Sequence, residues 1–446
     1  MNIIFERLKK ANLDTYNSIV LFLLAVCVRL WYVINNFWLA GDTPDYVELA
    51  KNLHFFKSFA FTAGNQLIPA AHPTDGLMLT AFRPVLYPFL ASLVWTGDDF
   101  PYTAIILIQV LLGGITVILT YLIARQHFSR SVAFVSALLL TISPLVIIFT
   151  GTILTETLFI FLTVLGCYLL SKKRFIPSGI VFGLALLTRP IILPFLLFLI
   201  FISLFSADRK KQILNYALVL IVALLVASPW IIRNSMLFNR FVLTQSSGYG
   251  TNLLAGSMEI PVKKASEAKE FWDAVFLNPC KLKEPPVCEK SFDELNEAEQ
   301  DGERVKTAIT IIKRDPVQWI KVRLKTYPKF FLVDDGNSVI KEESNLSIGQ
   351  AIQDRAVGIL LIKFSLFFFS IVLLICSLVG LYSIKNRLFE TSIVWTFPVF
   401  FALIHLPMSI EPRYFLPALP FYYILSTVGG FYLVEKLRSR FSKSAG

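Results

Sequence analysis

Apolar residues along this chain gather in long uninterrupted runs, not in the short alternating patterns of a water-soluble protein. Each run is close to the roughly 20 residues that a helix needs to cross a bilayer. We expect ten membrane spans, at 17–40, 102–124, 131–150, 153–170, 175–188, 191–207, 213–232, 357–384, 389–408 and 415–434. The pattern therefore predicts an all-α polytopic membrane protein with about ten transmembrane helices.

Basic residues in the alternate connections give the expected orientation of these spans. They lie at Lys9-Lys10, Arg125 to Arg130, Lys172-Lys173-Arg174, Arg209-Lys210-Lys211, Lys385 to Arg387 and Lys436 to Arg440. Cytoplasmic connections of membrane proteins are enriched in Lys and Arg. Both chain ends are therefore expected inside. Keeping the basic clusters on either side of 175–207 in one compartment requires two crossings there, so we predict two helices with a break at Pro190.

The same pattern divides the chain into three regions. Residues 1–232 form an N-terminal membrane module with an outer loop at 41–101, residues 233–356 an extracytoplasmic domain, and residues 357–446 the C-terminal membrane helices. Within the outer loop, 44–56 and 84–95 are predicted as short helices on the outer membrane surface. The domain at 233–356 is expected to be a small α or α+β insertion. Its part from Glu303 to Leu332 is amphipathic, and Pro316 divides that part into two helices expected to lie on the membrane.

Composition agrees with this topology and excludes one class of partner. The chain has 446 residues, of which 55% are hydrophobic and 16% charged, with a net charge of +11. The region 233–356 holds 18 basic and 18 acidic residues, so the basic excess lies elsewhere, largely at cytoplasmic span ends. The charge is therefore a sign of membrane orientation, and we expect no nucleic-acid partner.

Two of the five cysteines, Cys280 and Cys288, share the large outer region. In an oxidising exterior they are predicted to form a disulfide that closes a short loop, and two free thiols are the alternative. The four histidines are scattered, and none has a partner at metal-ligand spacing.

Asp42, Glu156, Arg189 and Arg413 are isolated charges at the ends of spans, and the span count places all four on the outer side. Charge so close to hydrocarbon is costly and usually functional. A carboxylate beside several arginines suits a reaction on an anionic lipid-linked substrate, with a base for one partner and cations for the other's phosphate.

Structural alternatives exist for each of these four residues. Asp42 could only cap the helix that starts at Pro44, and Glu156 could only satisfy a helix dipole. Arg189 and Arg413 could only anchor to lipid headgroups. A fifth charge, Arg29, lies in the middle of the first span, and a structural partner is expected for it.

Six motifs occur in order along the chain: Gly41-Asp42-Thr43-Pro44-Asp45-Tyr46, Phe82-Arg83-Pro84-Val85-Leu86-Tyr87-Pro88, Leu154-Thr155-Glu156-Thr157-Leu158-Phe159, Leu187-Thr188-Arg189-Pro190, Pro229-Trp230-Ile231-Ile232-Arg233-Asn234 and Glu411-Pro412-Arg413-Tyr414-Phe415-Leu416-Pro417. Together they resemble the GT-C membrane glycosyltransferases, and within these the bacterial protein-mannosyltransferase and aminoarabinose-transferase group. The likeness covers most of the chain up to Gly250 and again from Glu411 to Pro420.

The resemblance implies inverting transfer of a sugar from a polyprenyl-phosphate-linked donor to a lipid, glycan or protein acceptor. Asp42 would take the acceptor's proton. The resemblance assigns Arg83 to the donor phosphate, and their positions at span ends add Arg189 and Arg413. Four further residues would contact substrate: Asp45, Tyr46, Tyr87 and Glu156.

Thr43 follows Asp42 where family members often have a second acidic residue. No metal ligand is assigned for that reason, no cofactor is assigned with certainty, and a divalent metal is left open. The expected location is a bacterial inner membrane with an extracytoplasmic active site. A transporter or flippase for a lipid-linked sugar is the alternative function, although it should carry its charges near mid-membrane on broken helices.

Overall fold

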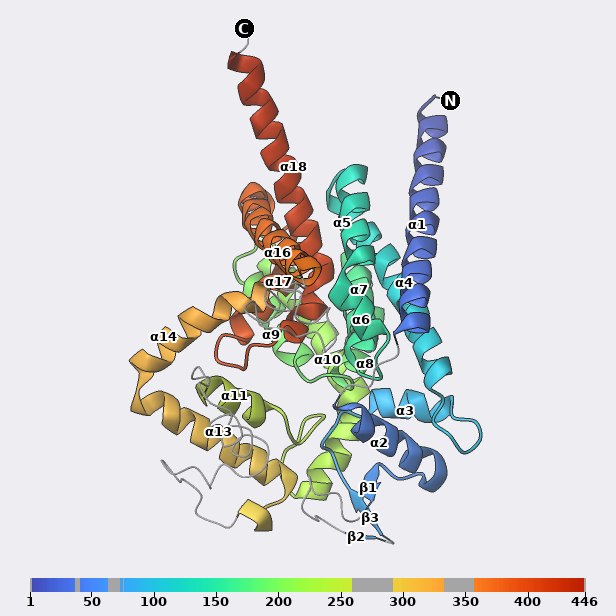
Figure 1. The fold of residues 1–446 in the computed structure, drawn as a ribbon, viewed down its shortest axis with the longest axis vertical. Helices are drawn as coiled ribbons and strands as arrows, with labels where there is room; N and C mark the ends of the chain where they lie inside the picture. The colour runs from blue at the N-terminus through green and yellow to red at the C-terminus, as the bar shows by residue number, and fades with distance from the viewer. Residues whose placement is uncertain are drawn as a thin grey trace.

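The computed structural model describes residues 2–36, 41–62, 73–74, 76–258, 292–332 and 357–444. Its upper part is a bundle of helices, and both chain ends lie at the same end of that bundle (Figure 1). Shorter helices and a small sheet gather at the opposite end. This arrangement agrees with the predicted orientation, in which both termini share one side and the outer regions share the other.

Within the described residues, five helical segments are long and apolar enough to cross a membrane. They lie in α1 (Asn2–Asn35), α4 (Tyr102–His127), α10 (Arg209–Phe238), α16 (Val357–Ser383) and α18 (Leu419–Ser444) together with the preceding 3₁₀ turn η7 (Pro412–Ala418). A sixth candidate is the pair α5 (Arg130–Ile142) and α6 (Pro144–Thr150), which is bent by 54°. The all-α polytopic class is therefore confirmed.

Four predicted spans correspond to shorter apolar helices of 10–17 residues: α7 (Glu156–Ser171), α8 (Phe175–Leu186), α9 (Ile192–Ser203) and α17 (Ser392–Ile404). The predicted break at Pro190 separates α8 from α9. Because a helix of 12 residues rises only about 18 Å, these elements are shorter than the hydrocarbon core. They are held by packing instead. A Cβ added at Gly183 of α8 would lie 2.6 Å from Val226 of α10.

The first outer loop contains the two expected helices, α2 (Thr43–Phe56) and α3 (Leu86–Leu93). Between them lies an antiparallel sheet in the order β1-β3-β2, formed by β1 (Ala60–Thr62), β2 (Pro73–Thr74) and β3 (Leu77–Leu79). This sheet was not expected, because strands of two or three residues are too short to show a period-2 pattern. Phe61 and Met78 pair in register and pack against Leu49, which joins the sheet to α2.

The outer end is completed by α11 (Tyr249–Met258), η3 (Phe292–Glu294), α13 (Glu297–Arg314), α14 (Pro316–Thr326) and η4 (Tyr327–Phe331). The predicted break at Pro316 is confirmed. Asn296 and Glu299 form a capping box that starts α13. The predicted disulfide between Cys280 and Cys288 lies outside the described residues and stays a prediction.

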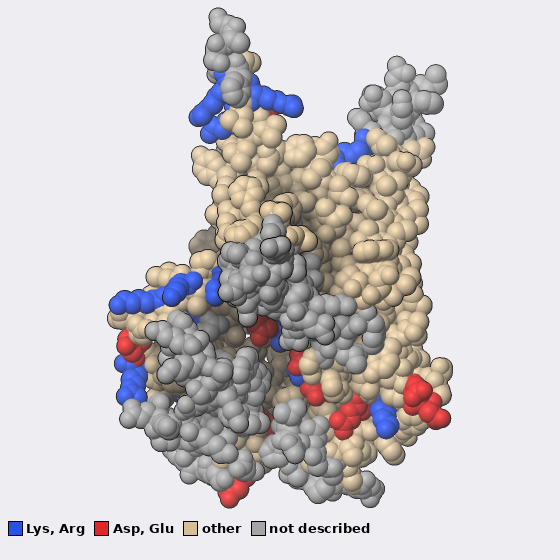
Figure 2. Space-filling view, in the orientation of Figure 1, with Lys and Arg blue, Asp and Glu red and all other residues tan. Residues whose placement is uncertain are grey.

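Charge is distributed along the molecule as a membrane protein requires. Figure 2 shows an uncharged band across the bundle, with basic residues beyond it at the end of α18 and mixed charges around the opposite end. The final turns of α18 expose Lys436, Arg438 and Arg440. The apolar band is therefore bounded by a basic side, where the termini lie, and by the side that carries the outer helices.

Candidate active site at the outer end of the bundle

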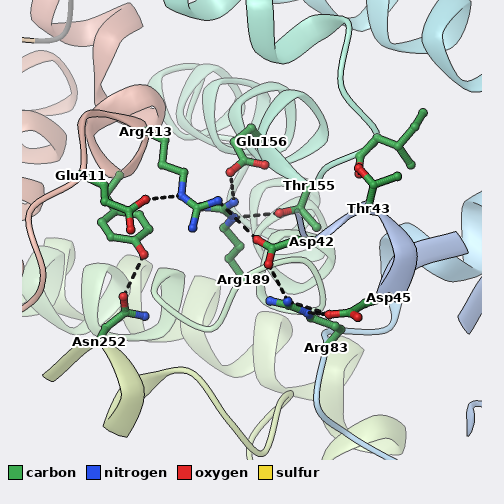
Figure 3. A network of polar contacts seen from close by, with 12 residues as sticks. Asp42, Thr43, Asp45, Arg83, Thr155, Glu156, Arg189, Asn252, Glu411 and Arg413 are labelled. Carbon is green, nitrogen blue, oxygen red and sulfur yellow. Dashed lines mark hydrogen bonds and ion pairs between the residues drawn. The ribbon is translucent and has the colours of Figure 1, made fainter. Parts of the chain in front are cut away.

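Charged side chains from five separate parts of the chain meet at the outer end of the bundle (Figure 3). Asp42 comes from the start of α2, Arg83 from the turn before α3, and Glu156 from the first turn of α7. Arg189 lies between α8 and α9, and Arg413 lies in η7. The structure therefore brings together five residues that the sequence analysis assigned to one site.

Asp42 is the centre of this cluster. Its two carboxylate oxygens accept from the Arg83 Nη2 at 2.8 Å and from the Arg413 Nη1 at 3.3 Å. Although Asp42 is the residue before α2, its side chain makes no capping hydrogen bond. The capping alternative is therefore not supported. Burial raises the pKa of Asp42, but the guanidiniums of Arg83 and Arg413 outweigh it and hold that pKa below its ordinary value.

Arg83 bridges two carboxylates, that of Asp42 just before α2 and that of Asp45 in its first turn. Its Nε and Nη2 donate to the Asp45 Oδ2 at 2.9 and 2.7 Å, while the same Nη2 contacts Asp42. The guanidinium carbon also lies 5.6 Å from the ring centre of Tyr46. Burial raises the pKa of Asp45 above its ordinary value even though Arg83 opposes this. The structure thus places Asp45 as a partner of Arg83, one turn after Asp42.

Arg189 and Glu156 form a second ion pair beside the first. The Arg189 Nη2 lies 2.6 Å from the Glu156 Oε1, and the Arg189 Nε donates to the Thr155 Oγ1 at 2.9 Å. Glu156 is only 2% exposed. Within the described residues its Oε2 has no hydrogen-bond partner. Glu156 therefore binds a cation as well as beginning α7, and Arg189 is engaged by protein groups in addition to any headgroup.

Arg413 has two acidic neighbours, because the Glu411 Oε2 lies 2.6 Å from its Nε. The adjacent Tyr414 donates its hydroxyl to the Asn252 Oδ1 at 2.8 Å (Figure 3). The candidate list did not contain Glu411, Thr155 or Asn252. Glu411 and Thr155 stand inside the quoted motifs and were within reach of sequence analysis. Asn252 lies in α11, 162 residues from Tyr414, and no local pattern points to it.

The two tyrosines assigned to substrate lie beside the charged cluster in a packed layer. The rings of Tyr46 and Tyr87 meet edge to face with centroids 5.4 Å apart. The Tyr87 hydroxyl donates to the Gln109 Oε1 at 2.8 Å, and the Gln109 amide donates to the carbonyl oxygens of Thr150 and Thr152. Tyr87 is thus already hydrogen-bonded to α4, and its proposed contact with substrate stays a prediction.

Comparison with known proteins gives one family model and several solved structures that this chain resembles. The family model described as dolichyl-phosphate-mannose-protein mannosyltransferase matches residues 83–232, about a third of the chain. The archaeal oligosaccharyltransferase AglB from Archaeoglobus fulgidus, solved with an inhibitory peptide and a dolichol-phosphate, superposes with a TM-score of 0.56 at 16% identity, over 98% of this chain and 52% of that chain. The chain has the GT-C glycosyltransferase fold.

Two further GT-C structures are similar to this chain. The apo form of the A. fulgidus oligosaccharyltransferase gives a TM-score of 0.54 at 15% identity, over 97% of this chain and 52% of that one. ArnT from Cupriavidus metallidurans in the apo state gives 0.38 at 14% identity, over 92% and 76%. No curated protein sequence matches the chain significantly. The chain spans about half the length of the oligosaccharyltransferase chains that it matches.

The match to the family model begins at Arg83 and contains Glu156 and Arg189, whereas Asp42 and Arg413 lie outside it. The resemblance stated from the motifs is confirmed, and the GT-C fold supports a glycosyltransferase. The match therefore covers only part of the charged cluster.

Another structure of the A. fulgidus enzyme is a complex with Zn and sulfate, at a TM-score of 0.53 and 16% identity. In the present chain the carboxylates best placed for a cation, Asp42 and Asp45, both converge on the Arg83 guanidinium. Within the described ranges no group of three His, Cys, Asp or Glu side chains is arranged to hold a metal. In this arrangement both carboxylates are paired with an arginine, and a divalent metal stays an untested expectation.

Proposed function

We propose that this protein is a GT-C glycosyltransferase that transfers a sugar from a polyprenyl-phosphate-linked donor to an acceptor hydroxyl or amine. The acceptor belongs to a lipid, a glycan or a protein, and the reaction takes place on the extracytoplasmic side of a bacterial inner membrane. The observation that carries the proposal is the position of Asp42, whose carboxylate lies between the guanidiniums of Arg83 and Arg413.

The arginines supply a site for the donor phosphate. A guanidinium binds phosphate through paired N–H groups and keeps its charge at every physiological pH. Arg83, Arg189 and Arg413 are each between a fifth and a third exposed, at 24%, 23% and 31% of their side chains. They are therefore neither sealed in the core nor freely solvated, so a phosphate can reach them from the outer membrane surface.

Binding of the phosphate would also prepare the base. In this structure the two guanidiniums stabilise the Asp42 carboxylate and lower its pKa, which makes Asp42 a poor proton acceptor. A phosphate that shares Arg83 and Arg413 withdraws part of that stabilisation, so the proton affinity of Asp42 rises. The base thus becomes effective only when the donor is in place.

The transfer step follows from these positions. Asp42 accepts the proton of the acceptor O–H or N–H, whose heavy atom forms a bond to the anomeric carbon while the bond from that carbon to the phosphate oxygen breaks. The products are the glycosylated acceptor and polyprenyl phosphate. Negative charge grows on the departing phosphate, and Arg83, Arg189 and Arg413 stabilise it. Attack on the face opposite the phosphate inverts the anomeric configuration.

The proposal is tested with Asp42→Asn in purified protein supplied with a panel of radiolabelled polyprenyl-phosphate sugars and membrane extract. We expect loss of product with retained donor binding, because Asn cannot accept the proton but leaves the arginines in place. Asp98→Asn is the matched control, since Asp98 is exposed in the turn before α4. Product formation that survives Asp42→Asn would contradict the proposal, and donor movement across vesicles without any product would favour the flippase.

A further inference from the structure

Two acidic residues on α13 lie outside the charged cluster and yet connect to it. Glu297 and Asp301 are four residues apart, so they share one face of the helix. Glu297 is only 3% exposed. Burying a carboxylate away from water is unfavourable unless donors surround it. The donors to Glu297 lie in the segment just before Arg83. The donors to Asp301 lie at the start of α11, which contacts the segment that carries Arg413.

Glu297 binds the segment directly before Arg83. Its Oε1 accepts from the Ala81 N at 2.7 Å, and the Thr80 Oγ1 donates to both carboxylate oxygens, at 2.9 and 3.1 Å. The opposite edge of this segment is held as well, because the Arg233 Nη1 donates to the Thr80 O at 2.6 Å. Residues 80 and 81 are therefore fixed on two sides, two positions before Arg83.

Asp301 reaches Arg413 through α11. Its carboxylate oxygens accept from the backbone N of Gly248 at 3.0 Å and of Gly250 at 2.9 Å, at the start of α11. A Cβ at Gly250 would overlap the backbone oxygen of Asp301, so α11 rests directly on α13. One turn later, Asn252 accepts at its backbone O from the Ser409 N at 2.9 Å and at its Oδ1 from the Tyr414 hydroxyl at 2.8 Å.

We propose that α13 sets the separation of the two guanidiniums on either side of Asp42, with Glu297 positioning Arg83 and Asp301 positioning Arg413. This inference rests on the proposed function, since it concerns the same phosphate site. Glu297 and Asp301 are positioning residues, because neither lies among the reacting groups. At metal sites, groups that orient a ligand typically change affinity or activity by about 10-fold to 100-fold when they are removed, and we expect the lower end of that range here.

The specific prediction is a pattern of coupling between variants. Glu297→Gln and Asp301→Asn are each expected to reduce kcat about 10-fold, with little change in the KM for acceptor. In an Arg83→Lys background, Glu297→Gln should lose most of its effect, whereas in an Arg413→Lys background it should keep it. Asp301→Asn should show the reverse pattern.

Three additional variants keep this experiment decisive. Glu303→Gln is the matched control, because Glu303 lies on the same helix and pairs at the surface with Lys306. If a carboxylate variant does not fold, Thr80→Val and Tyr414→Phe weaken the same two connections from the other side. Each removes a hydroxyl, while the Ala81 N to Glu297 and Ser409 N to Asn252 hydrogen bonds remain. Melting temperature in detergent separates loss of protein from loss of turnover.

Each outcome has a defined meaning. If both α13 variants combine additively with both arginine variants, or act no more strongly than Glu303→Gln, the positioning role is wrong while the proposed function stands. If the wild-type protein neither binds polyprenyl phosphate in vesicles nor transfers sugar, the proposed function fails and this inference fails with it. Selective coupling within each predicted pair supports the role of α13.

Discussion

Arg29 in the membrane and the arginines of the outer cluster show how the same side chain serves two purposes. Arg29 lies within the span Asn12–Asn35 and is fully buried. Its guanidinium donates to the carbonyl oxygens of Ala25, Leu140 and Thr141, at 3.2, 3.5 and 3.4 Å. The partners of Arg83 and Arg413 are instead side-chain carboxylates at the end of the bundle opposite the chain termini.

The carbonyl groups around Arg29 have a cause in the sequence. The carbonyl of Leu140 would bond the N–H four residues later, but that residue is Pro144, which has no N–H. The chain bends by 54° at this place, between α5 and α6. The last carbonyls of α5 also carry the negative end of its dipole, which favours a cation. Arg29 therefore donates hydrogen bonds to the carbonyl groups at the end of α5, and its expected structural partner is the backbone.

Charges near a membrane differ in whether a ligand can displace their partners. The backbone carbonyls at the end of α5 cannot move away unless the helix unwinds. The Arg29 guanidinium therefore stays hydrogen-bonded to them and cannot bind a ligand. The carboxylates of Asp42 and Asp45 can be replaced at their guanidiniums by a phosphate that carries the same charge. A buried arginine does not by itself indicate a ligand-binding site. An arginine whose carboxylate partners a phosphate can replace does.

The largest effect is expected for Arg83→Ala. Loss of a group that stabilises charge in the transition state typically costs about 100-fold to 1000-fold in kcat. The amount of protein in the membrane should stay near that of the wild type, because Arg83 is partly exposed and lies outside the bundle core. Sugar transfer and immunoblot quantification of the same membranes check this. A fall in activity matched by the fall in abundance would show that Arg83 is structural.

Arg29→Met is expected to show the opposite behaviour. It leaves the carbonyls of Leu140 and Thr141 without their donor, at a cost of about 1–3 kcal/mol for each unsatisfied buried group. The melting temperature and the yield should fall, while turnover per folded molecule stays close to the wild type. A variant that is fully stable but inactive would place Arg29 in the transport or transfer pathway and would remove the contrast.

The sequence was informative wherever a property depends on counting along the chain. The span count placed Asp42, Glu156, Arg189 and Arg413 on one side, and the structure brings them together. The break at Pro316 was likewise expected, since proline lacks the N–H that a continuous helix requires. The count was less informative about length, because four of the ten predicted spans are helices too short to cross alone.

Contacts between distant segments could not be predicted. Thr80 and Glu297 are 217 residues apart, and Asn252 and Tyr414 are 162 apart. A single sequence contains no periodic signal that links such positions. The short sheet of the first outer loop was not predicted for a different reason. Its strands of two or three residues are too short for an alternating pattern to be visible.

A smaller effect than that of Arg29→Met is expected for Gly113→Ala. A Cβ at Gly113 would lie 2.7 Å from the Arg29 Nε, so the guanidinium must shift away from α4. Overpacking of this kind costs about 1–3 kcal/mol, and the Arg29→Met background should relieve it. Gly358→Ala is the matched control, because nothing lies within 4 Å of a Cβ at Gly358. Equal melting temperatures for the two alanine variants would contradict the close packing of Arg29 against α4.

The smallest and most specific effect is expected in the pH dependence. Asp42 has a lowered pKa in the free protein, so its carboxylate stays ionised as the pH falls toward its ordinary range. The acid limb of kcat/KM reports the free enzyme, whereas the acid limb of kcat reports the donor complex. Because phosphate shares the guanidiniums in that complex, the decline of kcat should begin at a higher pH than the decline of kcat/KM.

Arginine variants decide whether this difference comes from the cluster. Arg413→Gln removes one cation from Asp42, so the pKa of its carboxylate should rise and the acid limb of kcat/KM should move to higher pH. Arg29→Met should leave the limb where it is, because the Arg29 guanidinium donates to the α5 carbonyls and not to Asp42. Coincident limbs for kcat and kcat/KM, or an equal shift in both variants, would mean that Asp42 does not titrate as the base. An arginine with exchangeable partners tunes a neighbouring acid, and one bound to a helix end does not.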